Sequence, residues 1–177
     1  MQVVKIVITG AFSAGKTNLI RSISEIEPVS TEYAVSDPTE RLQKDETTVA
    51  LDFGTININD DAALYLFGTP GQERFDFMWE HLSLGCLGYV VLVDSCRPAH
   101  FAETRHLMDR FSEITDAPFV VAANKQDDPS ALPLMYIRKR LQLPEYIPLL
   151  PCVATDRASV KAVLLGLLEH IEQLTTA

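Results

Sequence analysis

The chain has 177 residues, 47% of them hydrophobic, which suits one domain with a substantial buried core. Its formal net charge of −9 argues against sequence-independent nucleic-acid binding, which depends on Lys and Arg side chains that contact phosphates. The longest apolar run, residues 84–93, is too short to span a bilayer, and no targeting segment or lipidation cysteine is visible. We therefore expect a cytoplasmic protein without a stable membrane anchor.

Apolar runs typical of buried strands alternate with segments of helical periodicity along the chain. The predicted strands are residues 3–9, 47–59, 62–67, 87–93, 119–123 and 149–153. The predicted helices are residues 16–26, 72–84, 98–114, 131–141 and 156–174. This alternation predicts an α/β fold with a mostly parallel sheet and helices on both faces. The turn formers NDD at residues 59–61 predict a hairpin, and hence one antiparallel edge strand.

Residues 10–17, GAFSAGKT, match the phosphate-loop pattern G-x-x-x-x-G-K-[ST] and lie between a predicted strand and a predicted helix. In that context the backbone N–H groups of the loop and of the helix N-terminus point at phosphate oxygens. Lys16 is expected to neutralise the β and γ oxygens, and the Thr17 hydroxyl to bind Mg²⁺. The expected phosphate-binding residues of the loop are Ser13, Ala14, Gly15, Lys16, Thr17 and Asn18.

The sequence NKQD at residues 124–127 follows a predicted strand and indicates which base is bound. A carboxylate at Asp127 accepts hydrogen bonds from both N1–H and the exocyclic amine of guanine, whereas adenine offers a lone pair at N1. The backbone N–H of Ala154, in the sequence CVATD, is expected to reach the guanine O6. The expected guanine-binding residues are Asn124, Lys125, Asp127, Ala154 and Thr155.

Together with a threonine before the hairpin strand and GTPGQE at residues 68–73, these motifs resemble the Ras-like small GTPases over essentially the whole chain. The TPGQ form is most similar to the prokaryotic branch that includes the MglA-type polarity GTPases. The resemblance implies a single six-stranded G domain over residues 1–177 that switches between GDP-bound and GTP-bound states with Mg²⁺. It also implies protein effectors and a GTPase-activating protein at two switch regions.

The resemblance assigns further roles residue by residue. Gln72 matches the glutamine that orients the attacking water, and Gly71 matches the glycine whose N–H meets the γ-phosphate. In the first switch, Thr48 matches the Mg²⁺-binding threonine by its place before the hairpin strand, with Thr39 and Thr47 as alternatives.

The chain departs from the family at several positions around this site. Gly68 stands where the family has an acid linked to Mg²⁺, and Asp52 either replaces that acid or faces outward toward a partner. Phe12 stands where most relatives have a small glycine, and Thr155 replaces a lysine. Residues 25–46 are acidic and rich in turn formers, so we expect a solvated loop that the γ-phosphate orders for a partner.

Three hypotheses about function remain at this point. The leading one is a switch that slowly hydrolyses GTP, which Gln72 favours. The alternative is a GTP-binding scaffold with negligible hydrolysis, which Gly68 and Phe12 favour. A phosphoryl-transferring kinase fits least, because the sequence shows neither an acceptor pocket nor an Arg-rich lid.

Overall fold

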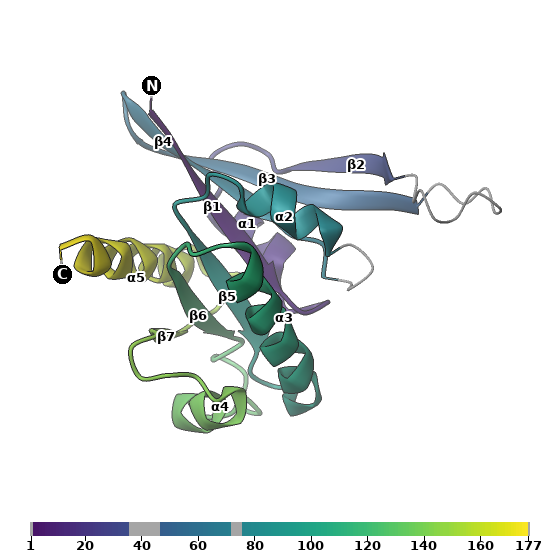
Figure 1. Cartoon of the computed structure of the whole chain (residues 1–177), viewed down its shortest axis with the longest axis vertical. Helices are drawn as coiled ribbons and strands as arrows, with labels where there is room; N and C mark the ends of the chain where they lie inside the picture. Colours follow the sequence, from purple (N-terminus) through teal and green to yellow (C-terminus); the bar gives the residue numbers. More distant parts are fainter. Residues whose placement is uncertain (1, 36–46, 72–75, 177) are drawn as a thin grey trace.

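The computed structural model describes residues 2–35, 47–71 and 76–176, and for residues 30–35 and 47–50 it describes the backbone alone. A seven-stranded sheet in the order β2-β3-β4-β1-β5-β6-β7 runs through its centre (Figure 1). The strands are β1 (Gln2–Gly10), β2 (Val29–Val35), β3 (Thr47–Asn59), β4 (Ala62–Gly68), β5 (Gly88–Asp94), β6 (Phe119–Asn124) and β7 (Leu149–Pro151). Strand β3 is antiparallel to both of its neighbours, and the other described pairs are parallel.

The predicted α/β class and the mostly parallel sheet are therefore confirmed, but the sheet has one strand more than the six expected. Strand β2 pairs with the outer side of β3, so β3 lies next to the edge strand and does not form the edge itself. Residues 29–35 fall within the segment predicted to be a loop, yet β-branched and aromatic residues alternate with other residues along them. Pairing with β3 along its whole length satisfies the backbone groups on one side of β2, and the other side forms the edge of the sheet. The remainder of the predicted loop, residues 36–46, lies outside the described residues.

Helices cover both faces of the sheet. Helices α1 (Lys16–Ile23) and α5 (Arg157–Thr176) pack on one face, and α2 (Phe77–Ser83), α3 (Phe101–Ile114) and α4 (Leu134–Leu141) pack on the other (Figure 1). Alternate residues of β1 serve the two cores, because Ile6 and Ile8 join the α1/α5 side while Val7 joins the opposite side. Each fully buried aliphatic side chain stabilises the fold by about 1.5–3 kcal/mol, so the sheet is a firm platform for the loops at its ends.

Two helices are shorter than predicted, for local reasons. Helix α1 ends at Ile23 because Ser24 is extended, and the Ser24 hydroxyl accepts a hydrogen bond from the Thr55 N–H of β3 at 3.2 Å. Helix α4 begins at Leu134 because Pro133 is extended, and a proline disfavours helical angles in the residue before it.

The predicted helix at residues 98–114 is a short 3₁₀ turn, η2 (Pro98–His100), followed directly by α3. The predicted helix at residues 72–84 is described from Phe77 onward as α2, and residues 72–75 lie outside the described residues. Within the described part of the chain, no helix is both long and apolar enough to cross a membrane.

The parallel register brings the sequence motifs to one edge of the sheet. Ile8 of β1 pairs with Gly68 of β4, Gly10 of β1 with Leu92 of β5, and Asp94 of β5 with Asn124 of β6. The segments 10–17, 68–71 and 124–127 therefore begin side by side at the carboxyl ends of their strands. In open α/β sheets this is the edge where ligands bind.

Candidate nucleotide-binding site

The phosphate loop joins β1 to α1 in a conformation that requires left-handed backbone angles. Gly15 has φ 108° and Ser13 has φ 62°, and the turn is closed by the Ala14 N–H, which donates to the Ala11 carbonyl at 3.1 Å. A Cβ at position 15 would lie 2.4 Å from Nδ2 of Asn124, so a larger residue would collide as well as strain the backbone. The loop adopts the strand–loop–helix form that presents N–H groups to phosphate oxygens.

Lys16 begins helix α1 and is almost completely buried. Its ammonium group donates to the carbonyl oxygens of Gly10 at 2.7 Å and Ala11 at 2.9 Å. Burial lowers the pKa of Lys16 to about 8, while the nearby charges of Asp52 and Glu103 act in the opposite direction. A buried ammonium with so little compensating charge is well suited to bind an anionic phosphate.

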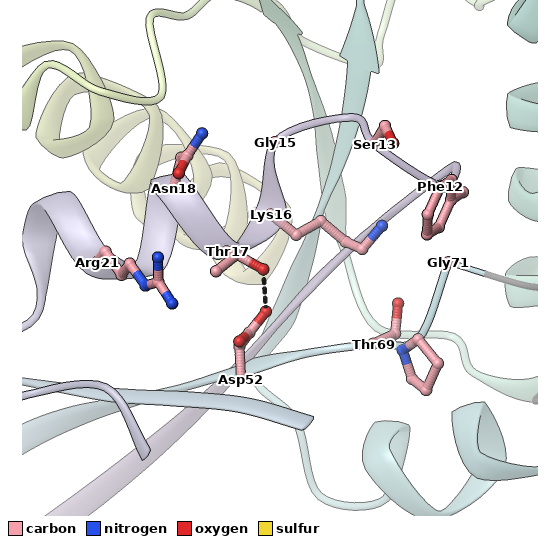
Figure 2. A pocket seen from close by; sticks show the side chains of 11 residues that line it. Phe12, Ser13, Gly15, Lys16, Thr17, Asn18, Arg21, Asp52, Thr69 and Gly71 are labelled. Carbon is pink, nitrogen blue, oxygen red and sulfur yellow. Dashed lines mark hydrogen bonds between the residues drawn. The ribbon is translucent and has the colours of Figure 1, made fainter. Parts of the chain in front are cut away.

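Asp52 faces the site from the strand opposite Gly68. Asp52 on β3 lies directly opposite Gly68 on β4, and its carboxylate accepts a hydrogen bond from the Thr17 hydroxyl, Oγ1 to Oδ2, at 2.5 Å (Figure 2). A Cβ at position 68 would lie 3.1 Å from the Asp52 Cβ and 3.5 Å from its Oδ2. Asp52 therefore fills the space into which a side chain at position 68 would extend, and the outward-facing alternative for Asp52 is wrong.

The chain that leaves β4 is held from two sides. The hydroxyl of Thr69 is hydrogen-bonded to the hydroxyl of Thr9 on β1, with 2.8 Å between the oxygens. The indole N–H of buried Trp79, on α2, donates to the Pro70 carbonyl at 3.3 Å. The first residues of the second switch therefore have fixed positions beside the phosphate loop.

Gly71 lies against the backbone of the phosphate loop. A Cβ at position 71 would approach the Phe12 Cα to 2.7 Å and the Lys16 Nζ to 3.0 Å, so only glycine fits there. The Phe12 side chain lines the adjoining cavity and is 60% exposed, so it is not packed into the core. The predicted water-orienting residue, Gln72, lies outside the described residues.

A cavity of about 530 Å³ opens over these groups (Figure 2). Its lining includes Lys16 and Thr17 of α1, Asp52 of β3 and Gly71. Arg21, which the sequence analysis did not single out, also lines this cavity from α1. Its position four residues after Thr17 is the signal that could have found it, because residues i and i+4 share a helix face. The side chain of Thr48, predicted to bind Mg²⁺, lies outside the described residues, although its backbone belongs to β3.

Asn124 connects three loops of the site. Its Nδ2 donates to the Ala14 carbonyl of the phosphate loop at 2.9 Å. Its Oδ1 accepts from the backbone N–H groups of Lys125 at 2.8 Å and Ala154 at 2.9 Å. The Ala154 N–H, expected to reach the guanine O6, thus has an acceptor within the protein. The structure gives Asn124 a positioning role that the sequence pattern alone did not reveal.

Lys125 is held by a carboxylate that the sequence analysis missed. Its Nζ donates to Oδ2 of Asp94 at 2.6 Å, and Arg97 lies 3.7 Å from the same oxygen. Asp94 is buried at the carboxyl end of β5 and also accepts from the Cys96 N–H. The sequence does contain a signal for this contact, because Asp94 is the single acid at the end of an apolar strand. A buried carboxylate needs a partner, and a nearby cation such as Lys125 can supply it.

A second cavity of about 540 Å³ adjoins the first. Its lining includes Asp127 and Thr155, and it shares Ser13, Gly15 and Asn18 with the cavity over the phosphate loop. The two cavities therefore border the same segment, the phosphate loop and the start of α1. This arrangement accommodates a ligand with phosphates at one end and a hydrogen-bonding base near a carboxylate at the other.

Comparisons with known proteins agree with this geometry. A family described as "Conserved hypothetical ATP binding protein" matches residues 27–174, which begin after the phosphate loop. The chain is 31% identical to ADP-ribosylation factor-like protein 4C of Homo sapiens over 150 residues, covering 83% of this chain and 73% of that protein. It is 31% identical to ADP-ribosylation factor-like protein 4D of Mus musculus over 147 residues, covering 81% and 68%.

An archaeal relative, uncharacterized protein MJ1339 of Methanocaldococcus jannaschii, is 28% identical over 124 residues, covering 70% of this chain and 71% of that protein. The narrower resemblance to a prokaryotic, MglA-type branch stays a prediction. With the motifs assembled at one edge of the sheet, the matches show that the chain belongs to the Ras superfamily of P-loop small GTPases, as a relative of the ADP-ribosylation factor-like proteins.

Proposed function

We propose that the protein is a guanine-nucleotide switch that binds GTP and GDP with Mg²⁺ and slowly hydrolyses GTP to GDP. The observation that carries this proposal is the pair of adjoining cavities, which share the phosphate loop and have Lys16 in one and Asp127 in the other. The matched family's description names ATP, but the Asp127 carboxylate suits guanine, which offers two donors on one edge.

The base preference is tested with the variant Asp127→Asn. We expect this variant to bind xanthosine triphosphate more tightly than GTP, because the 2-oxo group of xanthine accepts where the guanine amine donates. Asp128→Asn is the matched control, since the Asp128 carboxylate accepts from Ser130. Equal affinity of the wild-type chain for ATP and GTP, or an unchanged preference in Asp127→Asn, would show that the base assignment is wrong.

The residues of the phosphate cavity fit a magnesium ion. Thr17 offers a hydroxyl oxygen and Asp52 a carboxylate oxygen beside it, and oxygen donors of these kinds are the ligands that Mg²⁺ prefers. In the proposed site Thr17 would bind the ion and Asp52 would hold it through water. Thr48, the further ligand that the family resemblance implies, lies four residues from Asp52 along β3 and would have to move to reach the ion. When bound, the ion supplies positive charge that offsets the charge of the phosphates.

The variant Asp52→Ala tests this magnesium site. It should raise the Mg²⁺ concentration required for half-maximal GTP binding, while Asp60→Ala at the β3–β4 turn should not. An unchanged Mg²⁺ requirement in Asp52→Ala would show that the hydrogen bond to Thr17 is purely structural.

Hydrolysis requires a water to attack the γ-phosphorus as the bond to the β–γ bridging oxygen breaks. In the proposed mechanism Lys16 and the loop N–H groups hold the phosphate oxygens, and Gln72 orients the water, as the family resemblance implies. Gln72→Ala should lower the single-turnover rate at least about tenfold, equal to about 1.4 kcal/mol of barrier, without weakening GTP binding. A wild-type rate in this variant would favour the alternative of a GTP-binding scaffold.

We also propose that effectors and a GTPase-activating protein bind around the second switch. Two large apolar side chains beside that region are exposed to solvent. The exposed fraction is 60% for Phe12 and 46% for Phe77. Affinity purification with GTP-loaded and GDP-loaded protein tests this proposal. Partners that are retained equally by both forms would contradict it.

A further inference from the structure

A separate concave surface lies between η2 with the start of α3 and the end of α4. We name it the α3–α4 groove, and its volume is about 610 Å³. It shares no lining residue with the two nucleotide cavities. We call its apolar lining residues the floor (Pro98, Ala99, Phe101 and Ala102) and its polar lining residues the rim (Arg105, Lys139, Arg140 and Gln142). The groove therefore combines an apolar floor with a cationic rim.

The cations of the rim differ in how they are used. Arg105 holds the two helices together, because its Nη1 donates to the Leu141 carbonyl at 2.8 Å and its Nε lies 3.2 Å from Asp109. Lys139 and Arg140 are exposed in the last turn of α4, and the ion pairs found among the described residues include neither of them. The Arg140 guanidinium lies over the Tyr136 ring, 5.9 Å from its centroid, and the charge of Lys139 remains available to an external anionic group.

This local charge is opposite to that of the molecule as a whole, whose formal net charge is −9. Cations near the C-terminus of a helix interact favourably with its dipole, so Lys139 and Arg140 stabilise α4. That role does not explain why an apolar cavity lies beside them. Exposed apolar surface continues along the same helix, where Met135 is 86% and Tyr136 43% exposed. Apolar area bordered by unpaired charge is typical of a surface that binds another protein.

We propose that the α3–α4 groove binds an acidic peptide segment of a partner protein. One apolar side chain of the segment enters the cavity over Phe101, and its carboxylates pair with Lys139 and Arg140. Charge complementarity favours this occupant, because the chain otherwise repels acidic partners. A flat lipid surface would contact the projecting side chains but would not reach the concave floor. Inorganic phosphate would pair with the cations but would make no apolar contact with the floor.

The proposal is tested by selecting short random peptides, displayed on phage, on the full chain at low ionic strength. We expect the enriched peptides to be acidic with at least one large apolar residue. Their affinity, measured by fluorescence anisotropy on synthetic copies, should fall about tenfold or more in Lys139→Glu and should also fall with added salt. Lys161→Glu, the same change at an exposed position of α5, should leave the affinity unchanged.

A second variant tests the apolar floor without altering charge. Ala102 is exposed on α3 and lines the groove, so Ala102→Trp should fill the cavity and weaken the peptides, while nucleotide binding stays at the wild-type level. Failure to enrich acidic peptides, or peptides that bind Lys139→Glu and Ala102→Trp as tightly as wild type, would overturn the proposal. Binding to phosphatidylserine vesicles that Lys139→Glu abolishes, without peptide binding, would assign the groove to a lipid surface and overturn it equally.

Discussion

Replacing Gly68 by aspartate restores the acid that the family carries at this position, yet we expect it to destabilise this protein. A Cβ at position 68 would lie 3.1 Å from both the Asp52 Cβ and the Ile20 Cδ1, so these neighbours must move. Overpacking of this kind costs about 1–3 kcal/mol. The new carboxylate would also lie close to that of Asp52, and two like charges about 4 Å apart repel each other by up to about 4 kcal/mol near a protein surface.

Partial relaxation and protonation will relieve part of this repulsion, so we expect Gly68→Asp to lower the free energy of unfolding by about 3 kcal/mol. For a chain of this length that corresponds to a fall in Tm of about 6–12 °C. Thermal denaturation at neutral pH measures the change. Gly68→Ala is the matched control, because it adds the Cβ without the charge and should cost less.

The double variant Gly68→Asp/Asp52→Ala completes the test. Removing the Asp52 carboxylate should recover at least about 1 kcal/mol relative to the sum of the single changes, because the two acids compete for one space. It should also restore the Mg²⁺ requirement for GTP binding toward the wild-type value. Additive changes in the free energy of unfolding, within about 0.5 kcal/mol, would refute the conclusion that Asp52 fills the space of a side chain at position 68.

Three further expectations follow from the site. Asn124→Ala should lower the free energy of unfolding by about 1–3 kcal/mol and weaken nucleotide binding, because the Ala14 carbonyl and the Ala154 N–H both lose their partner. Denaturant titration measures the first effect and nucleotide titration the second. Wild-type values in both would contradict the positioning role of Asn124. Phe12→Gly should raise the single-turnover hydrolysis rate by opening space beside the γ-phosphate, and an unchanged rate would show that Phe12 does not restrict the site. Burial raises the pKa of the Cys152 thiol to about 11, so at pH 8 only about one thiol in a thousand is ionised. Iodoacetamide should therefore label Cys152 far more slowly in the folded protein than in the denatured protein, and mass spectrometry measures the two rates. Equal labelling rates would contradict this expectation.

The boundaries of the buried strands were predictable because a short continuous apolar run is stable mainly as a strand that is buried on both faces of a sheet. The buried strand β1 differs from its prediction by one residue at each end. The half-buried strand at residues 47–59 was predicted with its observed bounds because the NDD turn marks its end. Strand β2 was not predictable in the same way. It lies at the edge, where one side of the backbone meets solvent, and its short alternating pattern is surrounded by turn formers.

The phosphate loop and NKQD could be identified from the sequence because each is a contiguous segment whose geometry depends on its own residues. The orientation of Asp52 could not, because alternate residues of a strand face opposite sides and only the pairing with β4 determines which side faces Thr17. The role of Asn124 was likewise hidden. Its partners are 110 residues before it and 30 residues after it, and only the parallel sheet brings them within hydrogen-bonding distance.

The sequence by itself therefore determined the class of ligand, since phosphate and base recognition are encoded in local motifs that carry their own backbone geometry. The tertiary structure decided which acid faces the phosphate loop. That placement depends on the register of two antiparallel strands, in which Gly68 leaves a space and Asp52 extends into it from the neighbouring strand. A contact between residues on different strands is a property of the folded sheet, and no spacing within either strand specifies it.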